Sequence, residues 1–475
     1  MKSYDLIVIG TGSAMNIVDP MFRDNPNMKI AVIDKDEPGG ICLTRGCIPS
    51  KILLYPAELV RLTEKAREFG IATEIASIDF AQIMTRMRSL IDKDIDSIRR
   101  GLSSSENIDY FHEPAEFVSP YTLKVGGGTI TSKLIFLCIG SQTIIPPVKG
   151  LAEAGFLTSD EALKLKKLPK SVAIVGGGYI AAELGHFLAA MGSRVTIVGR
   201  NPQFIPEEEP EVSEVLRREL GRHMTILTNK EVREARTSGG LKRLVASDRK
   251  SGKTEEIAAE EILVATGRGP TSGILHPERG GVETDEHGWI KVDEYLQTSQ
   301  PGIWAIGDAD GRFMFKHVAN YESEVVYYNA VLKQKVKVDY HAVPHAVFTY
   351  PEAAGVGMKE NEAVEKFGRQ GVLIGFYKYE DTAKGEAMAA KDYFVKVILE
   401  KQTERILGAH IAGPYASMLI QELVNAMYTG DQGPRDLRRS MYIHPALNEV
   451  VQRALTSVYE VEEYHHMLSH QHEEE

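Results

Sequence analysis

The segment at residues 39–51 carries the residue types best suited to chemistry, because it places Cys42 and Cys47 beside glycines and Lys51. Two thiols separated by four residues can close a small ring, and the start of the helix predicted to follow favours a thiolate. The chain has only three cysteines, too few for a structural disulfide framework and typical of a reducing compartment. A pairing of Cys42 with Cys47 would therefore serve redox chemistry.

Two other interpretations of this pair stay open. A structural zinc site usually needs two close pairs of ligands, and the sequence offers no second cysteine pair or matching histidine pair. Inert buried thiols are the other alternative, which the neighbouring glycines and lysine disfavour. The third cysteine, Cys138, lies in an apolar run at residues 134–139 and is predicted to pack in the core.

His444 and Glu449, near the other end of the chain, could handle the protons of such chemistry. Thiol–disulfide exchange needs an acid for the departing thiolate and a base for the attacking thiol. A carboxylate partner would fix the imidazole tautomer and stabilise its cation. Without the cysteines, this histidine and glutamate would be an ordinary surface or core pair.

Two glycine-rich turns position these residues, and each lies in a βαβ pattern. The first pattern places a strand at residues 6–9, the turn at 10–13 and a strand at 28–33. Its glycines let a pyrophosphate approach, the helix start stabilises the charge, and Asp34 can bind ribose hydroxyls. Met15 replaces the small residue usual in this motif, which predicts looser packing, and Pro20 predicts that the helix ends or bends early.

The second pattern places a strand at residues 171–175, a turn at 176–178 and a strand at 194–198. It keeps the small residue Ala181, so a second dinucleotide is expected. Arg200 stands near the ribose-reading position, where an acidic residue would favour NADH, so NADPH is preferred. The acidic run at 207–209 argues against a strongly basic pocket, and a solvated Arg200 is the alternative.

The composition limits the remaining classes of function. A length of 475 residues suggests about three domains, and 43% apolar with 25% charged residues is typical of a folded, water-soluble chain. A net charge of −11 supplies no positive field for nucleic acid. The apolar runs are shorter than the roughly 18 residues of a membrane span. The N-terminal strand leaves no room for a signal peptide, so a cytoplasmic protein is expected.

The rest of the chain reads as mixed helix and strand. Helices are predicted at 51–69 and 80–102, and a hairpin at 122–131. From about Tyr340 the pattern predicts an α+β unit. The polar tail at 461–475 is expected to fray. Its histidines, including His466 and His470, are a weak candidate for metal binding, and no metal site is predicted.

The motifs together resemble the FAD-dependent pyridine nucleotide-disulfide oxidoreductases, which include dihydrolipoamide dehydrogenase, glutathione reductase, mercuric reductase and mycothione reductase. The segments that carry the resemblance are 40–51, 176–183, 265–268, 301–308, 348–352 and 444–445. The resemblance implies an α/β fold with two Rossmann-like nucleotide-binding domains and a C-terminal α+β dimerisation domain. The implied domains are an FAD-binding domain (1–147 and 270–338), an NAD(P)-binding domain (148–269), a dimerisation domain (339–460) and a flexible tail (461–475).

The resemblance also implies roles for individual residues. Cys47 would lie nearest the flavin and Cys42 would exchange with substrate, while Lys51 and Glu183 would form an ion pair beside the flavin. The implied FAD contacts are Gly10, Gly12, Ser13, Asp34, Lys35, Gly40, Lys51, Ala115, Gly140, Asp308, Met314, Phe315, Lys316 and His317. The implied nicotinamide-nucleotide contacts are Gly176, Gly178, Tyr179, Ile180, Glu183, Arg200 and Gly267, with Tyr179 as a possible gate.

The activity implied is electron transfer between NADPH or NADH, FAD, the Cys42–Cys47 pair and a small disulfide or dithiol. His444 and Glu449 would act on the disulfide of the other subunit, so the resemblance implies an obligate homodimer. Mycothione reductase and dihydrolipoamide dehydrogenase fit best, whereas mercuric reductase is disfavoured because no cysteine follows Cys138. The alternative function is a flavin-bound scaffold or electron-transfer protein without disulfide turnover.

Overall fold

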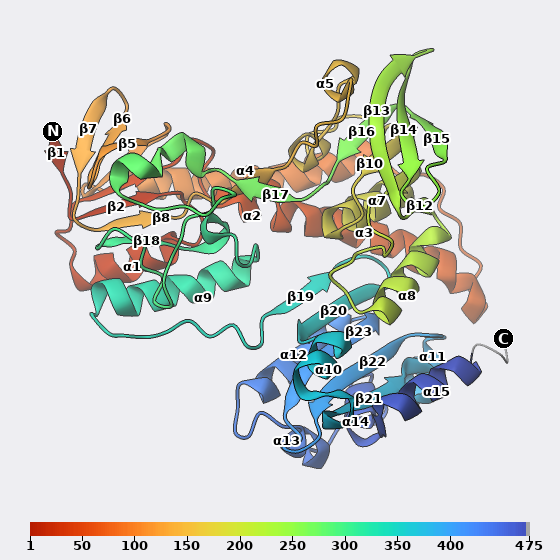
Figure 1. Cartoon of the computed structure of the whole chain (residues 1–475). Helices are drawn as coiled ribbons and strands as arrows, with labels where there is room; N and C mark the ends of the chain where they lie inside the picture. The colour runs from red at the N-terminus through yellow and green to blue at the C-terminus, as the bar shows by residue number, and fades with distance from the viewer. Residues whose placement is uncertain (472–475) are drawn as a thin grey trace.

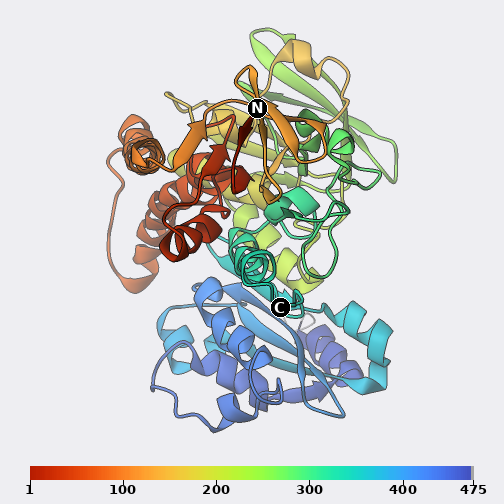
Figure 2. The same ribbon diagram turned by 90° about the vertical axis from the view of Figure 1, so that its left-hand side faces the viewer.

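Three units, each built on its own main sheet, make up the computed structural model, which describes residues 1–471 (Figure 1). Two units are centred on parallel sheets and contain the glycine turns, and the third is centred on a six-stranded sheet. The third unit lies below the other two in both views (Figure 2). No helix within residues 1–471 is long and apolar enough to cross a membrane.

The first unit has a five-stranded parallel sheet that alternates its side chains between two apolar layers. Its strands, in spatial order, are β18 (Ile303–Ala305), β8 (Ile135–Leu137), β2 (Leu6–Ile9), β3 (Ile30–Ile33) and β4 (Ile108–Phe111). One face packs on α1 (Met15–Asp24) and α9 (Lys316–Val326). The other faces a four-stranded sheet of β1 (Lys2–Ser3), β7 (Gly128–Thr131), β6 (Thr122–Val125) and β5 (Glu116–Ser119). The hairpin predicted at 122–131 is confirmed by β6 and β7.

The second unit repeats this plan at smaller scale. Its parallel sheet contains, in spatial order, β12 (Thr225–Leu227), β11 (Arg194–Val198), β10 (Ser171–Val175) and β16 (Glu261–Val264). The helices α7 (Tyr179–Met191) and α8 (Pro210–Gly221) pack with one apolar cluster. The opposite cluster is covered by an antiparallel sheet of β13 (Lys230–Ser238), β14 (Leu241–Asp248) and β15 (Thr254–Ala259). Both βαβ patterns are therefore confirmed, each opening on its glycine turn.

The third unit is the predicted α+β unit, and its sheet is antiparallel throughout. The strands, in spatial order, are β19 (Pro344–Val347), β20 (Glu352–Gly357), β23 (Ile406–Gly413), β22 (Phe394–Glu400), β21 (Val372–Lys378) and β24 (Val458–Glu460). The accompanying helices are α10 (Glu360–Phe367), α11 (Ala383–Ala387), α12 (Ala416–Met427), α13 (Arg435–Arg439), α14 (Glu449–Thr456) and α15 (Val461–Gln471). The α/β fold class with its C-terminal α+β unit is thus confirmed.

Short and long helices connect the first two units. The connecting elements are α2 (Gly40–Arg45), α3 (Cys47–Lys65), η1 (Ala66–Phe69), α4 (Phe80–Ser104), α5 (Leu151–Ala154), α6 (Ser159–Ala162) and a two-stranded sheet of β9 (Ser141–Thr143) and β17 (Arg268–Pro270). The helix α3 packs on both α4 and α7, so the cysteine segment is anchored to both units.

Two local expectations were wrong. Pro20 does not end α1, which continues to Asp24 because Ile17, Val18 and Met21 bury it against the sheet; a bend at Pro20 stays a prediction. The tail is helical over Val461–Gln471, where Tyr464 is fully buried against Phe376. In both places apolar packing outweighs the local signal for a break or for fraying. Residues 472–475 lie outside the described part of the chain.

Candidate active site

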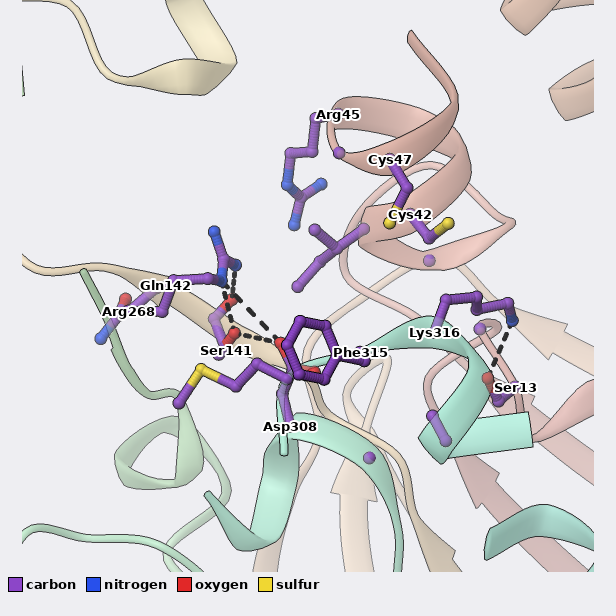
Figure 3. Close-up of a pocket in the computed structure, with 18 of the residues that line it drawn as sticks. Ser13, Cys42, Arg45, Cys47, Ser141, Gln142, Arg268, Asp308, Phe315 and Lys316 are labelled. Atoms are coloured by element: carbon purple, nitrogen blue, oxygen red, sulfur yellow. Dashed lines mark hydrogen bonds and ion pairs between the residues drawn. The ribbon is translucent and has the colours of Figure 1, made fainter. Parts of the chain in front are cut away.

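A cavity of about 1340 Å³ contains most of the predicted site residues. It is lined by both cysteines of the pair, by the first glycine turn and by the start of α7 and of α9. The predicted residues on its walls are Gly10, Gly12, Ser13, Asp34, Lys35, Gly40, Cys42, Cys47, Lys51, Ala115, Gly140, Tyr179, Ile180, Glu183, Asp308, Met314, Phe315, Lys316 and His317. Figure 3 shows the cysteines on one wall, with Phe315 and Asp308 across the space from them.

The cysteine pair spans the junction of α2 and α3, with Gly46 between them. Both are free thiols in this structure, and they interact by a hydrogen bond between their side chains. That hydrogen bond, helped by the charge of Lys51, lowers the pKa of Cys47 to about 7. The same hydrogen bond, together with burial, raises the pKa of Cys42. The reduced pair therefore has its thiolate on Cys47 and its proton on Cys42.

Lys51 and Glu183 form an ion pair that connects α3 with α7. The Lys51 Nζ lies 2.9 Å from Glu183 Oε1 and 2.8 Å from Oε2. The Phe348 amide donates to the same carboxylate at 3.1 Å, and its ring lies 4.5 Å from the Lys51 Nζ. Side chains from all three units thus meet beside Cys47, where the cation favours negative charge on the thiol.

The first glycine turn is held by contacts that only glycine permits. A Cβ on Gly10 would lie 2.1 Å from the Cys138 carbonyl oxygen, and one on Gly40 would lie 2.7 Å from the Gly12 Cα. Asp34 accepts from the Thr11 amide at 2.9 Å and from the Thr11 hydroxyl at 2.5 Å. The turn is therefore fixed with its backbone at the cavity wall, next to the cysteine segment.

Asp308 belongs to a polar cluster on the opposite wall, together with Ser141 and Arg268 (Figure 3). Ser141 donates to the Asp308 carboxylate, and the Arg268 Nε donates to the Ser141 hydroxyl at 2.7 Å. Burial lowers the pKa of Arg268, which the nearby Asp308 opposes. This cluster presents hydrogen-bonding groups to any ligand that extends along the cavity.

Lys316 projects into the cavity from the start of α9 and donates to the Ser13 hydroxyl at 2.8 Å (Figure 3). Burial lowers its pKa, an effect that negative charge on the neighbouring cysteines opposes. Cys138 packs against the apolar core as expected, but it also lines the cavity. Its thiol stays protonated, because burial raises its pKa.

These features fit a bound dinucleotide of the kind that the glycine turn predicts. The long cavity runs from the glycine turn to the cysteine pair, and the N-cap residue of α1, Ala14, provides no side-chain cap for the first amides. Uncapped amides at a helix start stabilise a phosphate. Lys316 adds a cation and Asp308 adds a carboxylate along the same walls.

The second glycine turn lies outside this cavity, although Tyr179 and Ile180 directly after it line the wall. Position 176 requires a glycine, because a Cβ there would lie 2.1 Å from the Ala265 carbonyl oxygen. Gly178 and Gly267 are unobstructed on their Cβ side, with nothing within 4 Å. Arg200 is 68% exposed, and its Nε lies 3.8 Å from Glu231 Oε1. The glycines and Arg200 are therefore placed for a ligand that approaches from solvent.

The acidic run at 207–209 does not face Arg200 as expected. Glu208 and Glu209 are buried, and they point at the third unit, where they pair with His345 and Lys396. The prediction that this run weakens a phosphate pocket was therefore wrong for two of its three carboxylates. Their burial beside basic partners explains the difference.

His444 and Glu449 are together but lie apart from the cysteines of their own chain. The His444 Nδ1 lies 3.1 Å from Glu449 Oε1, and the imidazole is 72% exposed. The hydrogen bond with His444 lowers the pKa of Glu449. Neither residue lines the cavity that holds Cys42 and Cys47.

Among the described residues, the cysteines belong to no group of ligands that could hold a zinc ion. Within residues 1–471, the group of three potential ligands close enough to share a metal ion is Glu209, Glu211 and Glu360, and the Lys396 Nζ lies 2.8–2.9 Å from all three. In the tail, His465 pairs with Glu360, and His466 contacts His470. The tail residue His472 lies outside the described residues.

Several residues on the cavity wall were missed by sequence reasoning. They are Thr11, Arg45, Ser141, Arg268 and His345. Arg45 and Arg268 lie inside motifs that carried the resemblance, so their position was a usable signal. Ser141 and His345 carried no such signal in the sequence, because their importance depends on partners that are distant in the sequence.

The chain is similar to known disulfide oxidoreductases over almost its whole length. It matches the family model described as pyridine nucleotide-disulphide oxidoreductase over residues 4–323, and the dimerisation domain of that family over residues 343–455. It is 34% identical to a mycothione reductase of Mycobacterium tuberculosis over 466 residues, which covers 96% of this chain and 99% of that protein. A dihydrolipoyl dehydrogenase of Synechocystis sp. is 32% identical over 474 residues, covering 95% and 98%. The solved Cu(II) complex of the HOCl-induced flavoprotein disulfide reductase RclA from Escherichia coli has a TM-score of 0.84 at 26% identity, covering 96% of this chain and 99% of that chain.

Proposed function

The chain belongs to the pyridine nucleotide-disulphide oxidoreductase family, and from that premise we propose that it reduces a small disulfide with electrons from NADPH. The observation that carries the proposal is the Cys42–Cys47 pair on the wall of the large cavity, with opposite pKa shifts on its two thiols. A pair that merely packed in a core would have both thiols held protonated by burial.

FAD is the proposed resident cofactor, and it would supply the electron relay between the nicotinamide and the cysteines. Its proposed holders are the first glycine turn, Asp34, Ala115, Asp308 and the start of α9. The proposed FAD-binding unit is 1–147 with 270–338, the NAD(P)-binding unit is 148–269 and the dimerisation unit is 339–460. The small number of cysteines supports a reducing compartment, so the proposed location is the cytoplasm.

The two cysteines would have different tasks. Cys47, whose pKa is lowered to about 7, holds the thiolate, and Lys51 stabilises that charge. Cys42 keeps its proton and must lose it before it can attack a disulfide. Glu183 holds Lys51 in place through two contacts below 3 Å. A base for Cys42 is therefore the remaining requirement.

We propose that His444 of a second copy supplies that base. In its own chain His444 lies outside the cavity, while its Nδ1 is engaged by Glu449, which leaves the Nε2 to exchange a proton. The match to a dimerisation domain supports a homodimer in which each subunit completes the site of the other. A mixture of two inactive variants tests this. Cys42→Ser and His444→Gln subunits, refolded together in equal amounts, should regain up to about one quarter of wild-type activity, because half of the dimers would be mixed and each of these would have one complete site.

NADPH is the proposed nucleotide because Arg200 lies beside the second glycine turn and is exposed. The burial of Glu208 and Glu209 removes two negative charges from the surface that a 2′-phosphate would approach. Glu231 remains as a competing partner for the guanidinium. Flavin bleaching with NADPH and with NADH would test the preference, and equal rates with both would contradict it.

The proposed substrate class is a small disulfide or dithiol, with mycothiol disulfide and lipoamide as the first candidates because of the two relatives described above. The test is turnover of the wild type with mycothiol disulfide, lipoamide and glutathione disulfide, each assayed with NADPH and NADH. Cys42→Ser and Cys47→Ser are the matched controls, and both should abolish disulfide turnover while retaining bound flavin. Undiminished turnover in either control would refute the role of the pair. A flavin-bound protein whose visible spectrum does not change when a dithiol is added would favour the alternative function, a flavin-bound scaffold without disulfide turnover.

A further inference from the structure

A row of basic side chains on the third sheet faces the acidic run before α8. The row contains His345 on β19, His410 on β23 and Lys396 on β22. Gly355 on β20 stands between the two histidines, and each of these positions is paired with the next across neighbouring strands. Side chains at paired positions lie on the same face of a sheet. The Lys396 end of this row holds Glu209, Glu211 and Glu360, and the His345 end holds Glu208.

Only the His345 end of this row reaches the cavity. The His345 Nε2 lies 3.0 Å from Glu208 Oε1, and the imidazole lines the cavity wall. Its ring stacks on Tyr179 with centroids 5.9 Å apart and an angle of 24°. A Cβ on residue 355 would lie 2.7 Å from the His345 Cε1, so the imidazole fits here only because residue 355 is a glycine.

Glu208 joins the two aromatic rings. It is fully buried, and its carboxylate interacts with the Tyr179 hydroxyl as well as with His345. Burial opposes its ionisation, but the pairing with His345 holds the net pKa of Glu208 below its usual value. Burial and the negative charge of Glu208 raise the pKa of Tyr179, which therefore stays a neutral phenol. The buried loop carboxylate thus lies 3.0 Å from the imidazole and acts on the phenol through its charge.

This contact lies on the cavity wall, next to the second glycine turn. Tyr179 is the first residue of α7, directly after the second glycine turn, and it also lines the cavity of the cysteine pair. The same loop is tied to the turn, since the Ile205 amide donates to the Gly177 carbonyl at 2.8 Å. A shift of Glu208 would therefore move Tyr179 and the turn together.

We propose that His345, paired with Glu208, is a positioning residue that holds Tyr179 for the reduced nicotinamide nucleotide. This inference rests on the proposed function, because Tyr179 would meet the nicotinamide only in a nucleotide-dependent oxidoreductase. Removing the imidazole would leave the buried carboxylate without the polar group that lies 3.0 Å from it, which is strongly unfavourable. Replacing the carboxylate as well would relieve that penalty, while a phenyl ring at position 345 keeps the stack on Tyr179.

The test compares the variants His345→Asn, His345→Phe and the double variant His345→Phe/Glu208→Gln. The matched control is His276→Asn, which breaks a surface contact of 3.4 Å with Glu278. Two readouts are needed: the Kd for NADP⁺ of the flavin-loaded protein by calorimetry, and flavin bleaching driven by NADPH or by a dithiol. The dithiol enters through the cysteines and bypasses Tyr179.

His345→Asn and His345→Phe are expected to raise the Kd for NADP⁺ and the KM for NADPH about tenfold, with dithiol-driven bleaching unchanged within about twofold. The double variant should recover most of the affinity lost in His345→Phe, and His276→Asn should match the wild type. Equal Kd for NADP⁺ and equal KM for NADPH in all variants would overturn the inference, as would a double variant no better than His345→Phe. Failure of the proposed function itself would look different, because neither NADPH nor dithiol would then bleach the wild-type flavin.

Discussion

The hydrogen bond from Cys42 is the largest cause of the acidity of Cys47, so replacing Cys42 by alanine should make Cys47 an ordinary thiol. A hydrogen bond to a charged group contributes about 1.5–3 kcal/mol, and one pKa unit corresponds to about 1.4 kcal/mol. Cys42→Ala should therefore raise the Cys47 pKa by roughly one to two units from its value of about 7. At pH 7 the thiolate fraction would fall from about one half to between roughly 1% and 10%.

The assay is the rate of alkylation of Cys47 by iodoacetamide across pH 5–10, followed by mass spectrometry after reduction with dithiothreitol. Cys42→Ser is the matched control, because its hydroxyl can still donate to the thiolate and should leave the midpoint near the wild-type value. Cys138 does not interfere, since burial raises its pKa. Identical midpoints for Cys42→Ala and Cys42→Ser would refute the hydrogen bond as the cause, and the charge of Lys51 would then have to explain the acidity.

Three further outcomes are expected. Lys51→Met should also raise the Cys47 alkylation midpoint, by less than Cys42→Ala because its charge is a smaller cause; an unchanged midpoint would contradict this. Arg200→Gln should raise the KM for NADPH several-fold and leave that for NADH unchanged; a parallel rise with both nucleotides would speak against phosphate recognition. Burial raises the pKa of Glu322 from 4.5 to about 7. The folded state therefore keeps a proton that the unfolded state loses above about pH 4.5, and the free energy of unfolding should fall as the pH rises from about 4.5 to about 7. Thermal melting from pH 4.5 to 7.5 should show a flatter profile for Glu322→Gln, and an equal slope in the wild type would contradict the assignment.

Much of the fold was predictable because its signals are local. Each βαβ pattern needs a strand, a glycine turn and a helix within a short segment, and both were found where the spacing placed them. The cysteine pair was equally local, since Cys42 and Cys47 lie at the junction of two consecutive helices. Short-range geometry of this kind follows from residue type and spacing alone.

The misplaced features depend on partners that are far away in the sequence. Pro20 predicts a break, yet three buried neighbours on α1 hold the helix together across it. Tyr464 lies in a polar, histidine-rich tail, but its ring is buried against Phe376 and within 5.1 Å of the Lys396 Nζ. The burial of α1 and the burial of Tyr464 could not be predicted from their own segments, because the polarity of neighbouring residues does not show which side chain faces the core.

The acidic run at 207–209 shows why charge in a sequence is a poor guide to the field at a site. Taken by position, its carboxylates would repel a phosphate bound at Arg200, whereas in the fold Glu208 and Glu209 face basic groups of the third unit. The nearest positions in the chain are thus not the nearest charges in space. The same burial that removes these carboxylates from the nucleotide surface joins Glu208 to Tyr179, so the loop contributes to the site from behind the cavity wall.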